Sequence, residues 1–170
     1  PNPSPGTSYV LQSWNGAASA IRLTTVTGTI PTATWNTGSA VFPVGGTAWN
    51  SGNLPNSAEQ MIETRKLAAN DARISSAVMM NGKIWAAHHI AFPSSGTPTS
   101  IDVQWWQLDG ASGGGFGAVL QRGRVGSATG QYKWFPGIAV NKNEDVIIGY
   151  SASSPSTRVS AAYVTRQATT

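Results

Sequence analysis

The sequence predicts an all-β fold made of antiparallel, up-and-down four-stranded sheets, such as the blades of a β-propeller. The first observation is an internal repeat, because the pattern of SSAVMMNGKIWAAH (residues 75–88) returns in PGIAVNKNEDVIIGYS (residues 136–151). Each copy has an apolar run, an Asn-led turn and a second apolar run, and each is followed by a third strand-like run. The second observation is a composition rich in Gly, Ser, Thr and Trp. Strand units repeated at this length are typical of propeller blades.

Length and composition favour one β-domain spanning residues 1–170. Charged residues make up 11% of the chain and there are seven Trp, which suits an extracellular all-β protein. Cysteine is absent, so disulfides and thiolate metal sites are excluded. The net charge of +4 comes from scattered basic residues, so no nucleic-acid partner is expected. No apolar run is long enough to cross a bilayer, and we expect no membrane span.

Residues 1–56 predict a partial blade followed by a long connection. Tyr9–Trp14 and Ala20–Val26 are strand-like, and an Asn-Gly pair between them is a strong turn signal. Thr27–Asn56 is rich in Thr, Gly, Pro and Trp with little periodicity. We therefore expect a connection there, with one or two short strands around Ala40–Val44.

Residues 57–127 predict one full blade. Ser57–Leu67 is ambiguous, because Ser57 followed three residues later by Gln60 fits a helical capping box. The surrounding repeat favours an extended conformation instead. Four strand-like runs of ordinary length follow, at Ile74–Met80, Lys83–Phe92, Ser100–Leu108 and Ala118–Val125.

Residues 128–170 predict a second partial blade with strands at Phe135–Val140, Val146–Ser151 and Arg158–Thr165. The chain then holds about three blades, whereas a propeller ring needs about four or more. We expect an incomplete ring with open strand edges, and such edges favour pairing with another chain. Either Tyr9–Trp14 or Arg158–Thr165 is expected to make that contact in a homo-oligomer.

Five segments carry a likeness to known repeat proteins: YVLQSWN (9–15), NDARISSAVMMNGKIWAAHH (70–89), VQWWQLD (103–109), VLQRGRV (119–125) and FPGIAVNKNEDVIIGYSASSPS (135–156). From about Tyr9 to Arg166 the chain resembles bacterial extracellular β-propeller-like repeat proteins of uncharacterised function. The resemblance implies a propeller-type fold and an extracellular setting, and it names no substrate. Sialidase-like propellers are a more distant comparison. Their Asp-box, Ser-x-Asp-x-Gly-x-Thr-Trp, is not intact here, and their carboxylate-binding Arg cluster has no match.

Asp71 and Arg73 form one candidate ligand-binding pair. They stand just before a strand and can share one face of an extended segment, where Arg73 would bind a carboxylate or sugar hydroxyls. The alternative is an internal ion pair, or a turn that Asp71 fixes through backbone hydrogen bonds. We favour the alternative, because structural ion pairs outnumber binding sites.

Trp106 is the candidate for stacking on a glycan. Trp105 and Trp106 point to opposite faces of a strand, so one of them should be less buried. Trp106 shares its face with the polar Gln104 and Asp102, and we therefore expect it to be the exposed, ligand-binding aromatic. We expect the other tryptophans to pack in the core.

His88 and His89 are adjacent on a strand, so their side chains point to opposite faces and cannot readily bind one metal together. We expect one partly buried and one exposed histidine, with no catalytic role. Asn141, Asn143 and Asp145 alternate across a tight turn and are candidate calcium ligands.

The 141–145 turn lacks the Gly and the bidentate carboxylate of a calcium loop, and a turn held by side-chain hydrogen bonds explains it without metal. No cofactor is expected. The run Gly113–Gly117 lacks the Lys-Ser/Thr ending of a phosphate-binding loop, and we expect a flexible hairpin loop there.

The sequence thus predicts a non-catalytic extracellular recognition or assembly protein, whose partner is a glycan or another protein chain. One alternative is a carbohydrate-active hydrolase or lyase, which needs two carboxylates about 5–10 Å apart across a cleft. Another is a structural subunit that polymerises through strand edges. The chain begins at Pro1 rather than Met, so we expect a processed, secreted protein or a piece of a longer one.

Overall fold

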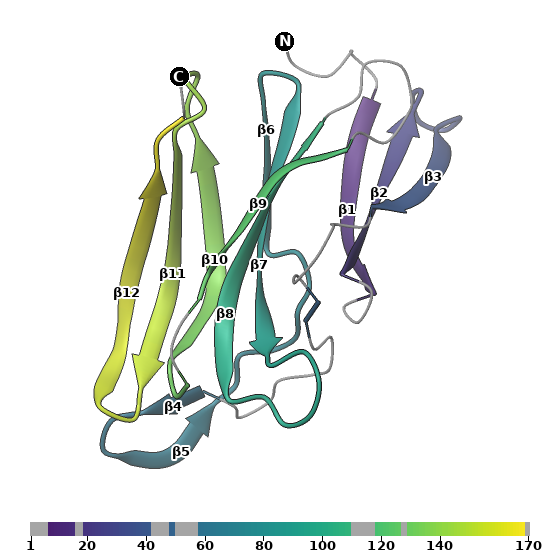
Figure 1. Cartoon of the computed structure of the whole chain (residues 1–170). Helices are drawn as coiled ribbons and strands as arrows, with labels where there is room; N and C mark the ends of the chain where they lie inside the picture. The colour runs from purple at the N-terminus through teal and green to yellow at the C-terminus, as the bar shows by residue number, and fades with distance from the viewer. Residues whose placement is uncertain are drawn as a thin grey trace.

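The computed structural model describes residues 7–15, 19–41, 48–49, 58–109, 118–126 and 129–168. Within these ranges every regular element is a β-strand (Figure 1), and the predicted all-β fold is confirmed. The strands are β1 (Thr7–Asn15), β2 (Ala20–Thr27), β3 (Thr34–Val41), β4 (Ala58–Gln60), β5 (Glu63–Leu67), β6 (Ser76–Met80), β7 (Lys83–Phe92), β8 (Ser100–Asp109), β9 (Val119–Val125), β10 (Tyr132–Val140), β11 (Val146–Ser154) and β12 (Thr157–Arg166). This part of the chain contains no helix that could span a membrane.

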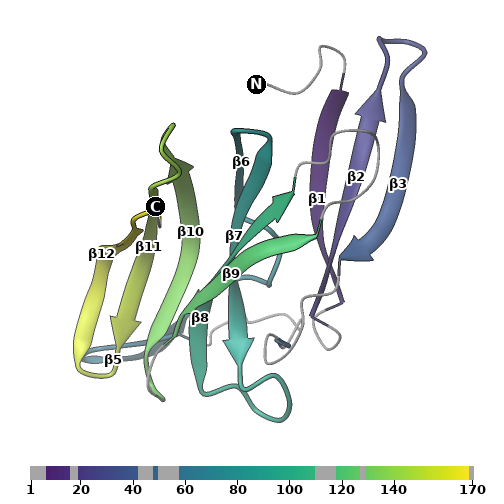
Figure 2. The same cartoon turned by 45° about the horizontal axis from the view of Figure 1, so that its top comes forward.

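The strands form three sheets in which nearly all neighbours are antiparallel. One sheet is β1-β2-β3, a second is the β4-β5 hairpin, and the third has seven strands in the order β12-β11-β10-β8-β7-β6, with β9 also beside β8. The prediction of separate four-stranded sheets is wrong here, because a parallel contact between Ile101 and Tyr132 joins β8 to β10. β9 pairs with β8 only from Val103 to Leu108. The first residues of β8, on the same edge, are therefore free to pair with β10. Figure 2 shows β9 and β10 leaning away from each other beyond this point.

The centre of the molecule is the β6–β7–β8 meander. Met80 pairs with Lys83, so the β6–β7 turn contains only Asn81 and Gly82, with φ values of 51° and 72°. Two-residue turns with two positive φ angles match the twist of a hairpin and favour Asn-Gly. β7 and β8 then pair without a break along the full length of both strands. These two long strands form the frame for the other sheets.

β7 and β8 are buried on both faces. On one face Ile90 and Trp106 pack in a cluster with Leu23 of β2. On the other face Trp85 packs in a cluster with Ile138 of β10. The strands β6–β9 therefore lie between β1–β3 and β10–β12, as both views show (Figures 1 and 2).

Two segments with an uncertain prediction contain β-strands in the structure. The expected long connection after Thr27 contains a full strand, β3, which pairs with β2; only part of the predicted Ala40–Val44 strand lies in the described residues. The extended conformation favoured for Ser57–Leu67 is confirmed by the β4–β5 hairpin, although Ser57 itself lies outside the described residues. Gly113–Gly117 also lies outside them.

The two copies of the sequence repeat touch each other at their turns. Lys83 Nζ lies 2.7 Å from both carboxylate oxygens of Glu144, and Asn81 Nδ2 donates to Lys142 O at 3.0 Å. In the strands, Ile138 N donates to Ser76 Oγ at 3.3 Å. The Lys83 hydrogen bonds hold the pKa of Glu144 below its ordinary value.

We expect the Lys83–Glu144 pair to couple the two repeats energetically. In a double-mutant cycle with Lys83→Met and Glu144→Gln, the coupling should be about 1–2 kcal/mol in urea unfolding, because the pair is partly buried. The pKa of Glu144 is lowered by folding, so this contribution is present above the ordinary Glu pKa and is lost as the pH falls through the folded value.

The matched control is the more exposed pair Lys66–Glu59, whose nitrogen and oxygen are 2.8 Å apart. The same cycle there should give a smaller coupling, because solvent screens an exposed pair. Equal coupling at both pairs would contradict a special role for Lys83 and Glu144.

Candidate functional site

Asp71 and Arg73 bind each other rather than forming an open clamp. Arg73 Nη2 lies 2.8 Å from Asp71 Oδ2, and the backbone N of Arg73 donates to Asp71 Oδ1 at 3.1 Å. The Asp71 side chain is mostly covered, whereas that of Arg73 is 84% exposed. The geometry is that of the internal ion pair and side-chain turn favoured as the alternative.

Trp106 is fully buried, so the expectation that it is the exposed member of the Trp105–Trp106 pair is wrong. Its ring packs edge-on against Trp49 at 6.0 Å and lies 6.2 Å from the ring of His88. The reason is tertiary: the β1–β3 sheet covers the face of β8 that carries Trp106. Trp105, on the other face, is only partly buried.

His88 and His89 do lie on opposite faces of β7, but both are buried, so the expectation of one exposed histidine is wrong. His88 Nδ1 donates to Ala72 O at 2.9 Å, and burial lowers the pKa of His88 to about 4. His89 packs edge-on against Phe135 at 5.5 Å, and burial lowers its pKa as well. Two neutral, enclosed imidazoles suit packing rather than proton transfer with a bound ligand.

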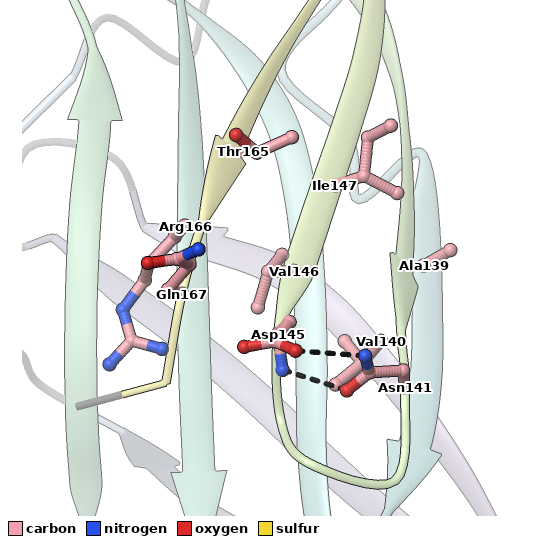
Figure 3. Close-up of a pocket in the computed structure, with 9 residues that line it drawn as sticks. All are labelled: Ala139, Val140, Asn141, Asp145, Val146, Ile147, Thr165, Arg166 and Gln167. Carbon is pink, nitrogen blue, oxygen red and sulfur yellow. Dashed lines mark hydrogen bonds between the residues drawn. The ribbon is translucent and has the colours of Figure 1, made fainter. Parts of the chain in front are cut away.

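The 141–145 turn uses its polar atoms internally. Asn141 Oδ1 accepts a hydrogen bond from the backbone N of Asn143 at 2.9 Å. Figure 3 shows the two bonds between Asn141 and Asp145: Asp145 N donates to Asn141 Oδ1, and Asn141 Nδ2 donates to Asp145 Oδ2, both at 2.9 Å. The other carboxylate oxygen of Asp145 accepts from Ala168 N at 2.9 Å. The described residues contain no group of three or more His, Cys, Asp or Glu placed to hold a metal ion. Side-chain hydrogen bonds thus account for this turn.

A groove of about 320 Å³ lies where β8 and β9 face β11 and β12. It combines the Trp105 and Arg166 side chains with an apolar wall. Arg124 also borders it, but its guanidinium carbon lies 4.2 Å from the Phe92 ring centroid, on the opposite face of the sheet from Trp105. None of the described residues that line it is acidic. They are Trp105, Arg124, Val125, Gly126, Val146, Ile148, Val164, Thr165 and Arg166.

The position of the Trp105 ring is defined by its contacts with three neighbouring residues. Its ring stacks on buried Trp85, with centroids 6.2 Å apart and planes at 24°. On β9, Gly123 leaves room for the indole, because a Cβ there would lie 2.5 Å from Trp105 Nε1. The Arg166 guanidinium carbon lies 5.8 Å from the Trp105 centroid, within cation–π range.

The two arginines of the groove differ in their surroundings. Arg124 Nε lies 3.6 Å from Asp102 Oδ2, and Asp102 is buried, which raises the pKa of its carboxyl group. Arg166 donates from Nη2 to the neutral side chain of Gln121. No ion pair to Arg166 is seen among the described residues, although the Arg166 charge helps to lower the pKa of Asp145, after the hydrogen bonds that Asp145 accepts from Ala168 and Asn141. Arg166 is therefore the positive group of the groove.

Sequence reasoning treated Trp105 as core and the arginines as scattered, and so missed this groove. Trp105 and Arg166 come from different strands, and only the fold brings them together. Gly123 was the available signal, because a lone glycine inside a strand often marks close approach of another group.

Comparisons of the chain with models of known protein families, with curated proteins and with solved structures found no match. No propeller is detected, and the likeness to extracellular propeller-like repeats remains a prediction. The geometry of the groove is the firmer guide to function.

Acid should destabilise the fold through His88. Its pKa is 6.5 when unperturbed and about 4 in the fold, so between these values the unfolded chain binds a proton that the folded chain does not. Above the unfolded pKa, His88 therefore has no effect on the free energy of unfolding. As the pH drops toward 4 the free energy of unfolding falls, by roughly 2 kcal/mol between about pH 7 and pH 5. Urea unfolding of His88→Gln should show a flatter pH dependence than the wild type. Equal pH slopes in the two proteins would rule this out.

Replacing Gly123 by Ala should displace Trp105. The added methyl overlaps the indole, so we expect a loss of about 1–3 kcal/mol in the free energy of unfolding, with a shift in Trp fluorescence. Gly137→Ala is the matched control, because a Cβ there meets nothing within 4 Å. A similar loss in both variants would indicate a general cost of replacing strand glycines.

Proposed function

We propose that the protein is a non-catalytic recognition protein that binds an acidic glycan in the Trp105–Arg166 groove. The observation that carries the proposal is a half-buried indole beside Arg166, whose guanidinium donates to the neutral Gln121 amide, in a groove with no acidic lining residue among those described. Its volume of about 320 Å³ fits one or two sugar rings rather than a long chain. Small-ligand sites begin at about this size.

The side chains of the groove match the two kinds of surface on an acidic sugar. The exposed part of the Trp105 ring offers an apolar surface for the C–H groups of a pyranose. A guanidinium binds a carboxylate through two parallel hydrogen bonds, which gives both affinity and orientation. Arg166 is placed beside Trp105, so one uronic-type residue can reach both.

The scaffold we propose is of the β-propeller type, with β6–β9 and β10–β12 as neighbouring blades. Support comes from the sequence repeat and from the contacts between equivalent parts of the two copies, including Ser76 with Ile138 and Lys83 with Glu144. An extracellular location belongs to the same proposal, and it rests on composition.

Catalysis is the weaker alternative. A hydrolase or lyase of this kind needs two carboxylates in one cleft, one of them protonated by burial. Glu59 and Glu63 do line one groove, of about 410 Å³. Glu59, however, is ion-paired with Lys66 at 2.8 Å, and Glu63 is exposed on a two-stranded hairpin. Neither carboxylate is enclosed as a general acid of this kind needs, so we propose binding alone.

The test is calorimetric titration with oligogalacturonate and with its methyl ester, which has the same rings without the charge. The wild type should bind the acid form, and Arg166→Gln should weaken that binding at least tenfold, as expected for loss of a charge-assisted hydrogen bond. Trp105→Leu should weaken the acid form and the ester alike. Unfolding curves of each variant separate loss of binding from loss of fold.

Arg158→Gln is the matched control, because Arg158 is an exposed arginine on the same strand and does not line the groove. It should bind as the wild type does. Equal binding of acid and ester would assign the groove to neutral ligands. Absence of binding to both, or an equal effect of Arg158→Gln, would refute the proposal.

A further inference from the structure

The Arg166 side chain is held in place by a neutral acceptor. Its guanidinium donates from Nη2 to the side-chain oxygen Oε1 of Gln121, on β9. The guanidinium carbon lies 5.9 Å from the Trp85 ring centroid and 5.8 Å from the Trp105 ring centroid, within cation–π range of both rings. Two aromatic rings and one amide oxygen therefore define where the charge of Arg166 lies.

Gln121 reaches Arg166 because of its place on β9. It stands two residues before Gly123, and Gly123 pairs with Trp105, so Gln121 lies on the face of the sheet that carries Trp105. Arg166 reaches the same face from β12, 45 residues further along the chain. The contact is therefore tertiary, and it forms only in the folded molecule.

A second glutamine, Gln107, stands between Gln121 and Glu144. It pairs with Gln121 across β8 and β9, and its Nε2 donates to Glu144 Oε2 at 3.3 Å. Both carboxylate oxygens of Glu144 lie 2.7 Å from Lys83 Nζ. Glu144 is thus paired with Lys83, and the side chains that lead from it toward Arg166 are two neutral amides.

Asp145 is a neighbouring carboxylate whose hydrogen bonds go to other groups. One of its oxygens accepts from Asn141 Nδ2 and the other from Ala168 N, both at 2.9 Å. The charge of Arg166 helps to lower the pKa of Asp145, after these two hydrogen bonds. The Arg166 guanidinium itself donates to Gln121, and it has further N–H donors that can reach a ligand.

We propose that Gln121 is the positioning residue that makes the groove specific for acidic ligands. An amide oxygen fixes the guanidinium beside Trp105 without cancelling its charge, so the Arg166 side chain is ordered before a ligand binds. A glutamate in the same place would accept two parallel hydrogen bonds from the guanidinium and neutralise it. The inference rests on the proposed function and adds that Gln121 sets the choice between acidic and neutral sugars.

The experiment is calorimetric titration of Gln121→Glu with oligogalacturonate and with its methyl ester. Binding of the acid form should fall at least about tenfold, whereas binding of the ester should be unchanged, because the added carboxylate competes only with a charged ligand. Gln121→Met removes the acceptor without adding a charge, and it should weaken the acid form severalfold. Adding Arg166→Gln to Gln121→Glu should cause no further loss, because both substitutions remove the same interaction.

Gln131→Glu is the matched control. Gln131 is an exposed glutamine whose Oε1 accepts from Lys133 Nζ at 3.4 Å, and it does not line the groove. The control makes the same change in net charge and should bind both ligands as the wild type does. Wild-type affinity for the acid form in Gln121→Glu, or an equal loss in Gln131→Glu, would overturn the inference while leaving the role of Arg166 intact.

A measurement without ligand separates this inference from the proposed function. In proton–nitrogen correlation NMR spectra the Nε–H signal of Arg166 can be assigned by its absence in Arg166→Gln. It should shift in Gln121→Met and in Gln121→Glu, and keep its position in Gln131→Glu. An unshifted signal in both Gln121 variants would overturn the inference. A shifted signal in a protein that binds neither ligand would support the positioning of Arg166 by Gln121 and refute glycan binding alone.

Discussion

The structure depends on the burial of β7 and β8 on both faces. A strand pair with only one apolar face can be stabilised by a single partner sheet, but a pair that carries Trp85 on one side and Trp106 on the other needs two. Each fully buried large side chain contributes about 1.5–3 kcal/mol, and both tryptophans are at 0% exposure. The β1–β3 sheet covers one face and β10–β11 the other, so the order of the three layers follows from this requirement.

Both covers combine apolar packing with enclosed polar atoms. The β10–β11 side is an apolar cluster with the Lys83–Glu144 pair at its edge. Within the described part of the chain, His88 Nε2 and Trp49 Nε1 on the β1–β3 side and Trp85 Nε1 on the other side have no hydrogen-bond partner. An unsatisfied buried group costs about 1–3 kcal/mol, so both faces carry a cost that the apolar burial has to exceed. Acid weakens both covers, through protonation of His88 on one side and of Glu144 on the other.

Local signals in the sequence were sufficient for the strands of the repeat but not for what lies between them. Asn81-Gly82 specifies its hairpin through backbone geometry alone. The alternation of apolar residues in β10 and β11 can likewise be recognised from the sequence by itself. β3 was missed because TWNTGSAV has little alternation, and it becomes a strand by pairing with β2. Alternation also shows that Trp105 and Trp106 face opposite ways, but the depth of cover on each face is a tertiary property. The groove could not be foreseen for the same reason, because Trp105 and Arg166 meet only after β8 and β12 are placed.

The two similar hairpins differ in how much of each is covered. Met80 pairs with Lys83 across a two-residue turn, whereas Val140 pairs with Val146 across a longer one, so the two are not in the same register. The first hairpin carries Trp85, which is fully buried in a cluster with residues of β10 and β11. The second carries Ile147, which is 45% exposed, and Tyr163 on the neighbouring strand β12 is 71% exposed. A hairpin of this kind therefore becomes a core element buried on both faces or an outer sheet with one open face according to the neighbours that pack on it.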